Sequence, residues 1–137
     1  MLVRVMGTAV IGAALACGAG GCAVETVQPA PIFVTGRVTI DWTINGAVDP
    51  AQCRQGGATT FDVDFTDAVG RFAGEYQADC AAFATTIDLP PGGYTGSTRL
   101  LDDSGNARTT QVDLRPFSII EGTNLDVSVE FPASSFF

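Results

Sequence analysis

The chain has 137 residues, the usual size of one domain, and 46% of them are hydrophobic. It carries seven arginines, fifteen acidic residues and neither lysine nor histidine, for a formal net charge of −8. Such acidity repels phosphate backbones, so we expect no nucleic-acid partner. Without histidine or lysine, the Ser-His-Asp, Cys-His and Ser-Lys groups of nucleophilic catalysis are excluded. We therefore expect no enzymatic activity, cofactor or metal, and the one catalytic alternative is a hydrolase built on paired carboxylates.

The N-terminal region has the pattern of an export signal. A single positive charge at Arg4 precedes an uncharged run of apolar and small residues from Val5 to Ala16. This run is shorter than the roughly 20 residues that a membrane-spanning helix needs, and it matches the apolar region of a signal peptide. Small residues follow it and lead to Cys17 and then to Cys22.

A cysteine that follows small residues at the end of such a run resembles the lipobox of bacterial lipoproteins. In that family the signal is cut before the cysteine, and the thiol receives a diacylglyceryl group. Cys17 directly follows the apolar run, which favours it as the lipidated residue. Lipidation of Cys17 would leave Cys22 as a free thiol. Lipidation of Cys22 would instead remove Cys17 with the signal and leave no free thiol, because Cys53 and Cys80 can pair. One of these two N-terminal cysteines is therefore the expected lipidation site, and both candidates stay open.

The resemblance divides the chain into three parts. Residues 1–21 are the expected signal peptide and lipobox region, residues 22–32 a proline-containing tether, and residues 33–137 the folded domain. In lipoproteins of the enteric type, an aspartate directly after the lipidated cysteine implies retention in the inner membrane. Here the residue at that position is Gly18 or Ala23, which implies the outer membrane. We therefore expect an exported protein of the cell envelope, held at the outer membrane by its lipid.

The folded region begins with an alternating pattern typical of a half-buried strand. Six apolar or small residues occupy every second position: Val34, Gly36, Val38, Ile40, Trp42 and Ile44. The turn pair Asn45-Gly46 ends this strand. Asp49 before Pro50 then predicts an N-capped short helix that runs to about Gln55.

Six further segments have strand character and are separated by turns. Their apolar or β-favouring residues start near 61, 72, 83, 94, 110 and 125, and the turn-forming stretches include Pro90–Gly93 and Asp102–Asn106. Seven short strands with turns every eight to fifteen residues are typical of an all-β protein. The predicted fold is a seven-stranded antiparallel β-sandwich of the immunoglobulin-like or transthyretin-like kind.

Two turn motifs support this fold through a resemblance. Leu89–Tyr94 (Leu-Pro-Pro-Gly-Gly-Tyr) and Leu101–Gly105 (Leu-Asp-Asp-Ser-Gly) are similar to turns in transthyretin-like, or carboxypeptidase regulatory-like, sandwich domains. The wider arrangement resembles small bacterial lipoproteins built on such a domain. Domains of that superfamily are mostly accessory or binding modules, so the resemblance implies a binding role and no catalytic residue.

Cys53 and Cys80 are the expected disulfide of this exported domain, since thiols outside the cytoplasm tend to be oxidised. The bridge would close a loop of about 28 residues and contribute roughly 3.6 kcal/mol by the chain-entropy model. A redox pair or metal site is less favoured, because neither a CxxC spacing nor a histidine is present.

The remaining candidates have simpler interpretations. Asp62 and Asp64 share the outward face of one predicted strand, where a cation could bridge them, but no calcium-loop motif is present and a solvated face is the expectation. Trp42 could stack on a sugar, yet its place between Ile40 and Ile44 favours core packing. The expected function is therefore a lipid-anchored envelope protein that binds another envelope protein or a glycan. A structural or surface-coat protein without a ligand is the alternative.

Overall fold

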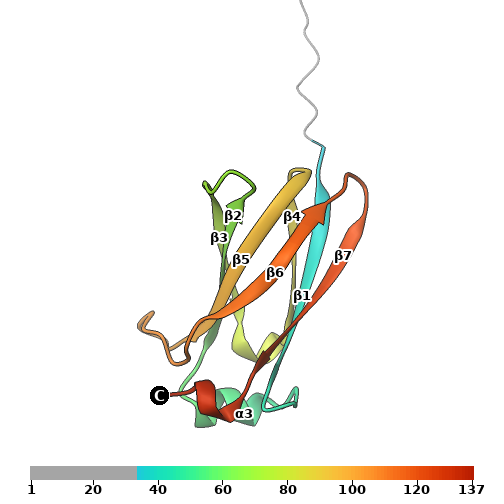
Figure 1. Ribbon diagram of the computed structural model, residues 1–137. Coiled ribbons are helices and arrows are strands. Elements are labelled where there is room, and N and C mark those ends of the chain that lie inside the picture. The colour runs from blue at the N-terminus through green and yellow to red at the C-terminus, as the bar shows by residue number, and fades with distance from the viewer. Residues whose placement is uncertain (1–33) are drawn as a thin grey trace, which may run out of the picture. The chain divides into compact units, whose positions relative to one another are not determined.

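The computed structural model describes residues 34–137, which form two β-sheets packed face to face (Figure 1). The three-stranded sheet has the order β4 (Ala84–Leu89), β1 (Gly36–Ile44) and β7 (Asn124–Phe131). The four-stranded sheet has the order β3 (Phe72–Asp79), β2 (Thr60–Asp67), β5 (Gly92–Leu101) and β6 (Val112–Ile119). The predicted all-β sandwich of seven strands is confirmed. The predicted signal peptide, lipobox cysteines and tether lie outside the described residues.

The first strand follows its sequence pattern closely. Buried residues alternate along β1 with more exposed ones, and Val38, Ile40 and Trp42 are almost fully buried. Since β1 is central in its sheet, its inward face packs on the four-stranded sheet while its outward face carries threonines and charged residues. The alternation thus places this strand in the middle of the core.

One strand pair departs from the predicted antiparallel arrangement. β1 and β7 run parallel, with a register from Arg37 opposite Asn124 to Ile44 opposite Phe131. The other four strand pairs are antiparallel. Parallel strands cannot be joined by a tight turn, and β1 and β7 are the first and last strands of the domain. The prediction was therefore wrong for this pair, because periodicity carries no information on strand direction.

The short helix is present where the sequence predicts it. Helix α3 spans Pro50–Gln55, with proline in its first turn and Asp49 as its N-cap. The Asp49 carboxylate accepts a 2.9 Å hydrogen bond from the Ala51 N–H, which satisfies one of the free donors at the helix start. Among the described residues the other helical segments are two 3₁₀ turns, η1 (Cys80–Ala82) and η2 (Ala133–Ser135).

Two strand boundaries differ from the prediction at the edge of the four-stranded sheet. β5 already begins at Gly92, inside the predicted break, and β6 continues past Pro116 to Ile119. The register between these strands shifts between Tyr94 and Gly96. Such a bulge leaves Pro116, which has no N–H, on an edge strand where it costs no ladder hydrogen bond.

The core lies between the sheets and is rich in aromatic rings. Trp42 of β1 stacks on Phe61 of β2, with ring centroids 3.9 Å apart. Phe65 contacts the rings of Tyr94 and Phe117 edge to face nearer the other end of the sandwich. The Trp42–Phe61 pair joins the two sheets, whereas the Phe65 group packs neighbouring strands of the four-stranded sheet against one another. Within residues 34–137 there is no helix of the length and hydropathy needed to cross a membrane.

Candidate binding groove

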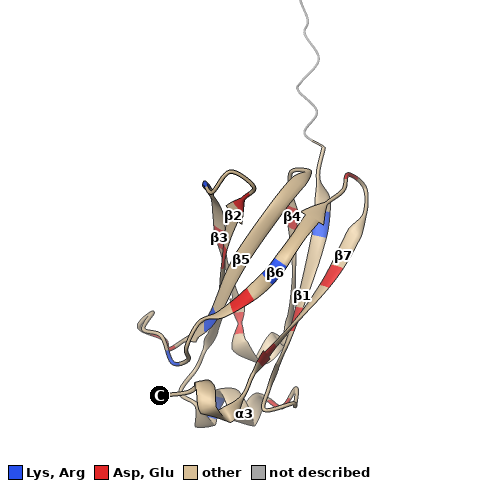
Figure 2. Cartoon of the chain, in the orientation of Figure 1, with Lys and Arg blue, Asp and Glu red and all other residues tan. Residues whose placement is uncertain are grey.

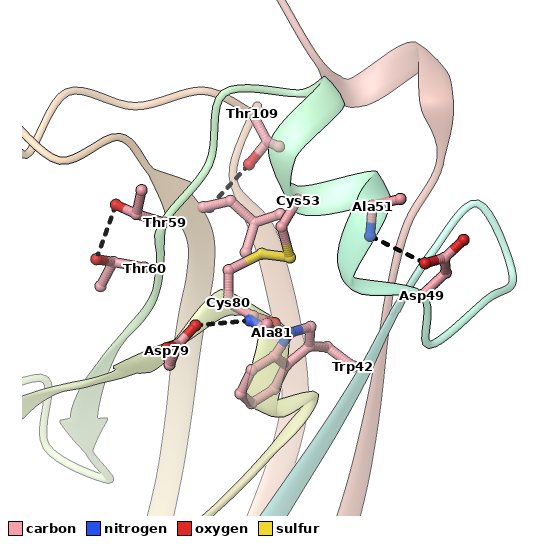
Figure 3. The surroundings of a disulfide bond; sticks show 11 residues. Trp42, Asp49, Ala51, Cys53, Thr59, Thr60, Asp79, Cys80, Ala81 and Thr109 are labelled. Atoms are coloured by element: carbon pink, nitrogen blue, oxygen red, sulfur yellow. Dashed lines mark hydrogen bonds between the residues drawn. A yellow bond between two sulfur atoms is a disulfide. The ribbon is translucent and has the colours of Figure 1, made fainter.

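The predicted disulfide is formed between Cys53 and Cys80, whose Cα atoms are 6.1 Å apart (Figure 3). Cys53 lies in α3 and Cys80 begins η1, so both belong to short helical segments and not to the strand edges expected from the sequence. Both cysteines are buried at one end of the sandwich. The bridge is a structural element, and it indicates a protein that folds outside the reducing cytoplasm.

The outer face of the four-stranded sheet holds a buried charge that the sequence does not predict. Asp62 is only 1% exposed, although its position on β2 predicts a solvated side chain. Its carboxylate accepts hydrogen bonds from Gln77 Nε2 at 3.0 Å and from Arg99 Nε at 3.1 Å. These long side chains belong to the flanking strands β3 and β5 and cover Asp62 from both sides. The expectation of a solvated face was therefore wrong for this residue.

Three carboxylates meet on this face. Asp62, Asp64 and Glu75 each offer an oxygen, and these oxygens lie within 4.8 Å of one another. A hydrogen bond with Asp62 and repulsion from Asp62 and Asp64 raise the pKa of Glu75. Arg99 lies 3.7 Å from Asp64 as well as contacting Asp62. Since this guanidinium already supplies positive charge to the cluster, the arrangement does not require a cation.

Trp42 and Tyr94 do not form an exposed stacking platform. Trp42 is buried in the core, as its sequence neighbours predict. Tyr94 is also buried, and its hydroxyl donates a 2.7 Å hydrogen bond to the Pro90 carbonyl oxygen. Burial raises the pKa of the Tyr94 phenol. These rings therefore serve packing and the turn before β5.

The groove suited to a ligand lies between β6 and β7, where the two sheets separate at one side of the sandwich. It encloses about 560 Å³. Its lining includes apolar side chains that are buried or half-buried: Val112, Leu114, Phe117, Leu125, Val127 and Val129. Sequence periodicity assigns these residues to the core, and only the assembled sheets show that several of them border an opening.

Both strands that border the groove are sheet edges. Within the described residues β6 pairs with β5 alone, and β7 pairs with β1 alone. Pro116 has no N–H and therefore interrupts the row of backbone donors along β6. A proline of this kind commonly protects an edge strand from pairing with another chain. No proline interrupts β7, whose sequence is Asn-Leu-Asp-Val-Ser-Val-Glu-Phe. Of the two edges that border the groove, that of β7 is therefore the one open to pairing.

The direction of the β7 backbone groups follows from its parallel partner. The Arg37 N–H donates to the Thr123 carbonyl, and the Asn45 N–H donates to the Phe131 carbonyl, both at 2.8 Å. In a parallel ladder alternate residues face the neighbouring strand, so the odd-numbered residues of β7 face β1. The N–H and C=O groups of the even-numbered residues point to the free edge: Asn124, Asp126, Ser128 and Glu130.

Charge in the groove is mostly negative. Asp113 on β6 and Asp126 and Glu130 on β7 line it, against the single cation Arg115 (Figure 2). Glu130 also accepts a 2.9 Å hydrogen bond from the Gly46 N–H, which holds its carboxylate near the end of β7. The groove thus combines an apolar lining, a free strand edge and an acidic rim. The sequence signals that could have identified it are Pro116, which marks an edge strand, and the acidic residues on the outward positions of β7.

No family model matches the chain, and no curated protein matches it. A solved structure with similarity is a leucine-rich repeat protein from Bacteroides thetaiotaomicron VPI-5482, at 16% identity and a TM-score of 0.45. The match covers 75% of this chain and 15% of that one, so the present chain spans a small part of that protein.

Proposed function

We propose that this protein is a lipid-anchored component of the bacterial cell envelope whose sandwich binds an extended segment of another envelope protein along β7. The lipobox-like pattern at Cys17 and Cys22 supports the anchor. The disulfide supports an oxidising compartment outside the cytoplasm. Outer-membrane placement and membership in a transthyretin-like lipoprotein family belong to the same proposal.

The observation that carries the binding role is the free edge of β7 beside an apolar groove. An extended peptide can add a strand to such an edge, with backbone hydrogen bonds supplying affinity and alternate side chains supplying specificity. The free N–H and C=O groups of Asp126 and Ser128 offer the backbone contacts. Every second side chain of the added strand would then enter the groove between β6 and β7.

The groove specifies the chemistry of this segment. Its apolar lining favours valine, isoleucine or leucine at alternate positions. Its three carboxylates and one guanidinium favour arginine or lysine between them. We therefore assign β7 a partner segment of alternating apolar and basic residues. A glycan is less favoured because Trp42 and Tyr94 are buried.

A pair of variants at Ser128 tests the strand addition. Ser128→Pro removes the edge-facing N–H, whereas Ser128→Ala removes the same hydroxyl and keeps that N–H. The probe is a fluorescent octapeptide of alternating valine and arginine, titrated against the full chain by anisotropy. We expect binding by the wild type and Ser128→Ala, and affinity lower by about tenfold in Ser128→Pro, as for one lost hydrogen bond.

A matched octapeptide of valine and glutamate is the charge control, and we expect no binding. Equal affinity of both Ser128 variants would overturn strand addition on β7. If neither peptide binds but the anchor test succeeds, a structural envelope protein without a ligand explains the results better than a binding protein.

The anchor has its own test. Cys17→Ser, Cys22→Ser and the double variant are compared by detergent partitioning, and mass spectrometry identifies the mature N-terminus. We expect one single variant and the double variant to lose both lipid and membrane partitioning. A double variant that is processed normally and stays with the membrane would overturn lipidation.

A further inference from the structure

We infer that one end of the sandwich is a lipid-contacting surface, which we call the entry end because the chain enters β1 there. This inference rests on the proposed anchor. The entry end comprises residue Val34, the β2–β3 and β6–β7 loops, and the β4–β5 turn, which lie together opposite the end that carries α3 and the C-terminus (Figure 1).

Backbone contacts join these segments into one surface. The Gly122 N–H of the β6–β7 loop donates a 3.0 Å hydrogen bond to the Thr35 carbonyl oxygen, next to Val34. Gly92, at the start of β5, is paired with Ile119, the last residue of β6. The β2–β3 loop and Pro91–Gly93 line a common depression. The entry end is therefore continuous from the first described residue to the β2–β3 loop.

The entry end gathers exposed apolar side chains. Of the six large apolar residues that are exposed in the described part of the chain, four lie here: Val34 (45%), Val69 (68%), Phe72 (69%) and Ile120 (63%). Pro90 and Pro91 are exposed on the same end. The remaining two, Val48 (64%) and Phe137 (66%), lie toward the opposite end, because Val48 stands between β1 and α3 and Phe137 ends the chain. Apolar side chains that are exposed at one end of a domain are suited to the headgroup and acyl boundary of a lipid layer.

Charges at the entry end are few and mostly matched. Arg37 pairs with Asp88, with the Arg37 Nε atom 2.8 Å from the carboxylate. The Asp67 carboxylate accepts hydrogen bonds from the Val69 and Arg71 N–H groups, which orders the loop that presents Phe72. Arg71 stands beside Phe72 and offers a cation to lipid phosphate. Glu121 of the β6–β7 loop is a further, exposed acid, so Arg37 and Arg71 stand against three carboxylates and this end carries only a small part of the domain's net negative charge.

The length of the chain before β1 limits how far this end can lie from an anchored lipid. From Cys22 to Val34 there are twelve residues, so the chain between them reaches at most about 40 Å, and from Cys17 at most about 60 Å. A lipid on either cysteine therefore holds the point of entry into β1 within about 40 to 60 Å of the bilayer, and the entry end is the part of the domain nearest the attachment point along the chain. The occupant that this connection supplies is the lipid surface itself.

Tryptophan reporters test the inference in the full, lipidated chain. Phe72→Trp and Ile120→Trp place the reporter at the entry end, and Val48→Trp is the matched control at the opposite end with similar exposure. Trp42 is buried and supplies the same background in every variant. Each protein is reconstituted in phosphatidylethanolamine and phosphatidylglycerol vesicles, with and without bromine on the acyl chains, and co-flotation is measured on the same samples.

We expect the emission maxima of Phe72→Trp and Ile120→Trp to move to shorter wavelength on vesicles of either kind, and brominated lipid to quench their emission. Val48→Trp should behave like the wild type. Co-flotation with no quenching at positions 72 and 120, or equal quenching at position 48, overturns the lipid-contacting end and leaves the anchor standing. Failure to co-float overturns the anchor together with this inference.

Discussion

The indole Nε1 of Trp42 donates a 3.0 Å hydrogen bond to the carbonyl oxygen of Cys80 (Figure 3). This contact ties the central strand of one sheet to the turn that holds the disulfide. The same indole stacks on Phe61 of the opposite sheet, with ring centroids 3.9 Å apart. A single side chain thus joins both sheets and the covalent cross-link.

Trp42→Phe should destabilise the domain more than its change in apolar area alone explains. The substitution leaves the Cys80 carbonyl without its indole donor in a buried site, which costs about 1–3 kcal/mol in addition to the lost packing. Urea unfolding measures the difference. Phe131→Leu is the control, because it removes a buried ring without a hydrogen bond. A Trp42→Phe loss under about 0.5 kcal/mol, the range of ordinary surface changes, would contradict this role.

Removal of the disulfide should lower stability by about 2–5 kcal/mol, as in other small exported domains. Cys53→Ser and Cys80→Ser should each lower the melting temperature by about ten degrees or more. The double variant should be little worse, because both substitutions abolish the same bond. Calorimetry with and without reductant checks this, and a melting temperature insensitive to both reductant and mutation would be the contrary result.

The turn at Asp102 should stabilise the fold at neutral pH and cease to do so in acid. Its carboxylate accepts hydrogen bonds from the N–H groups of Ser104 and Asn106, and those from the loop backbone lower the pKa of Asp102. A lowered pKa in the folded state gives stability that is present above the ordinary value of 3.8 and is lost as pH falls through the folded value. Asp102→Ala should therefore be less stable than wild type at pH 7.

The difference in the free energy of unfolding between Asp102→Ala and wild type should shrink steadily below pH 3.8. Urea unfolding over a pH series measures it, with the exposed neighbour in Asp103→Ala as the matched control. A difference that is constant from pH 7 to pH 2 would show that the loop hydrogen bonds do not depend on the charge. Asp67 accepts hydrogen bonds from Val69 and Arg71 in the same pattern, so its pKa is also lowered and it should respond alike.

Glu75 should show the opposite pH dependence. Its pKa is raised by the hydrogen bond with Asp62 and by the charges of Asp62 and Asp64. Its contribution to stability is therefore fully present below the ordinary value of 4.5 and is lost as pH rises through the folded value. Glu75→Gln should be more stable than wild type at pH 7 and equal to it near pH 3. Glu121→Gln, in the β6–β7 loop, is the control, and a Glu75→Gln variant less stable at pH 7 would contradict the repulsion.

Features that depend on near neighbours along the chain could be predicted. Strict alternation from Val38 to Ile44 determined β1 and its buried face, because side chains of a strand point to opposite sides with a period of two. Asp49 before Pro50 determined the start of α3, since N-capping involves residues two positions apart. The Cys53–Cys80 pairing followed from the number of cysteines together with the prediction of an export signal.

Other features exist only after the strands have paired. The parallel pairing of β1 with β7 joins the two ends of the domain, and no local pattern records its direction. Asp62 is buried because Gln77 and Arg99 arrive beside it from two other strands, whereas its own alternation predicts exposure. The groove beside β7 arises because two sheet edges meet without closing. Periodicity along the chain thus determined which residues face inward, and long-range strand pairing decided which of those inward faces stayed open to a ligand.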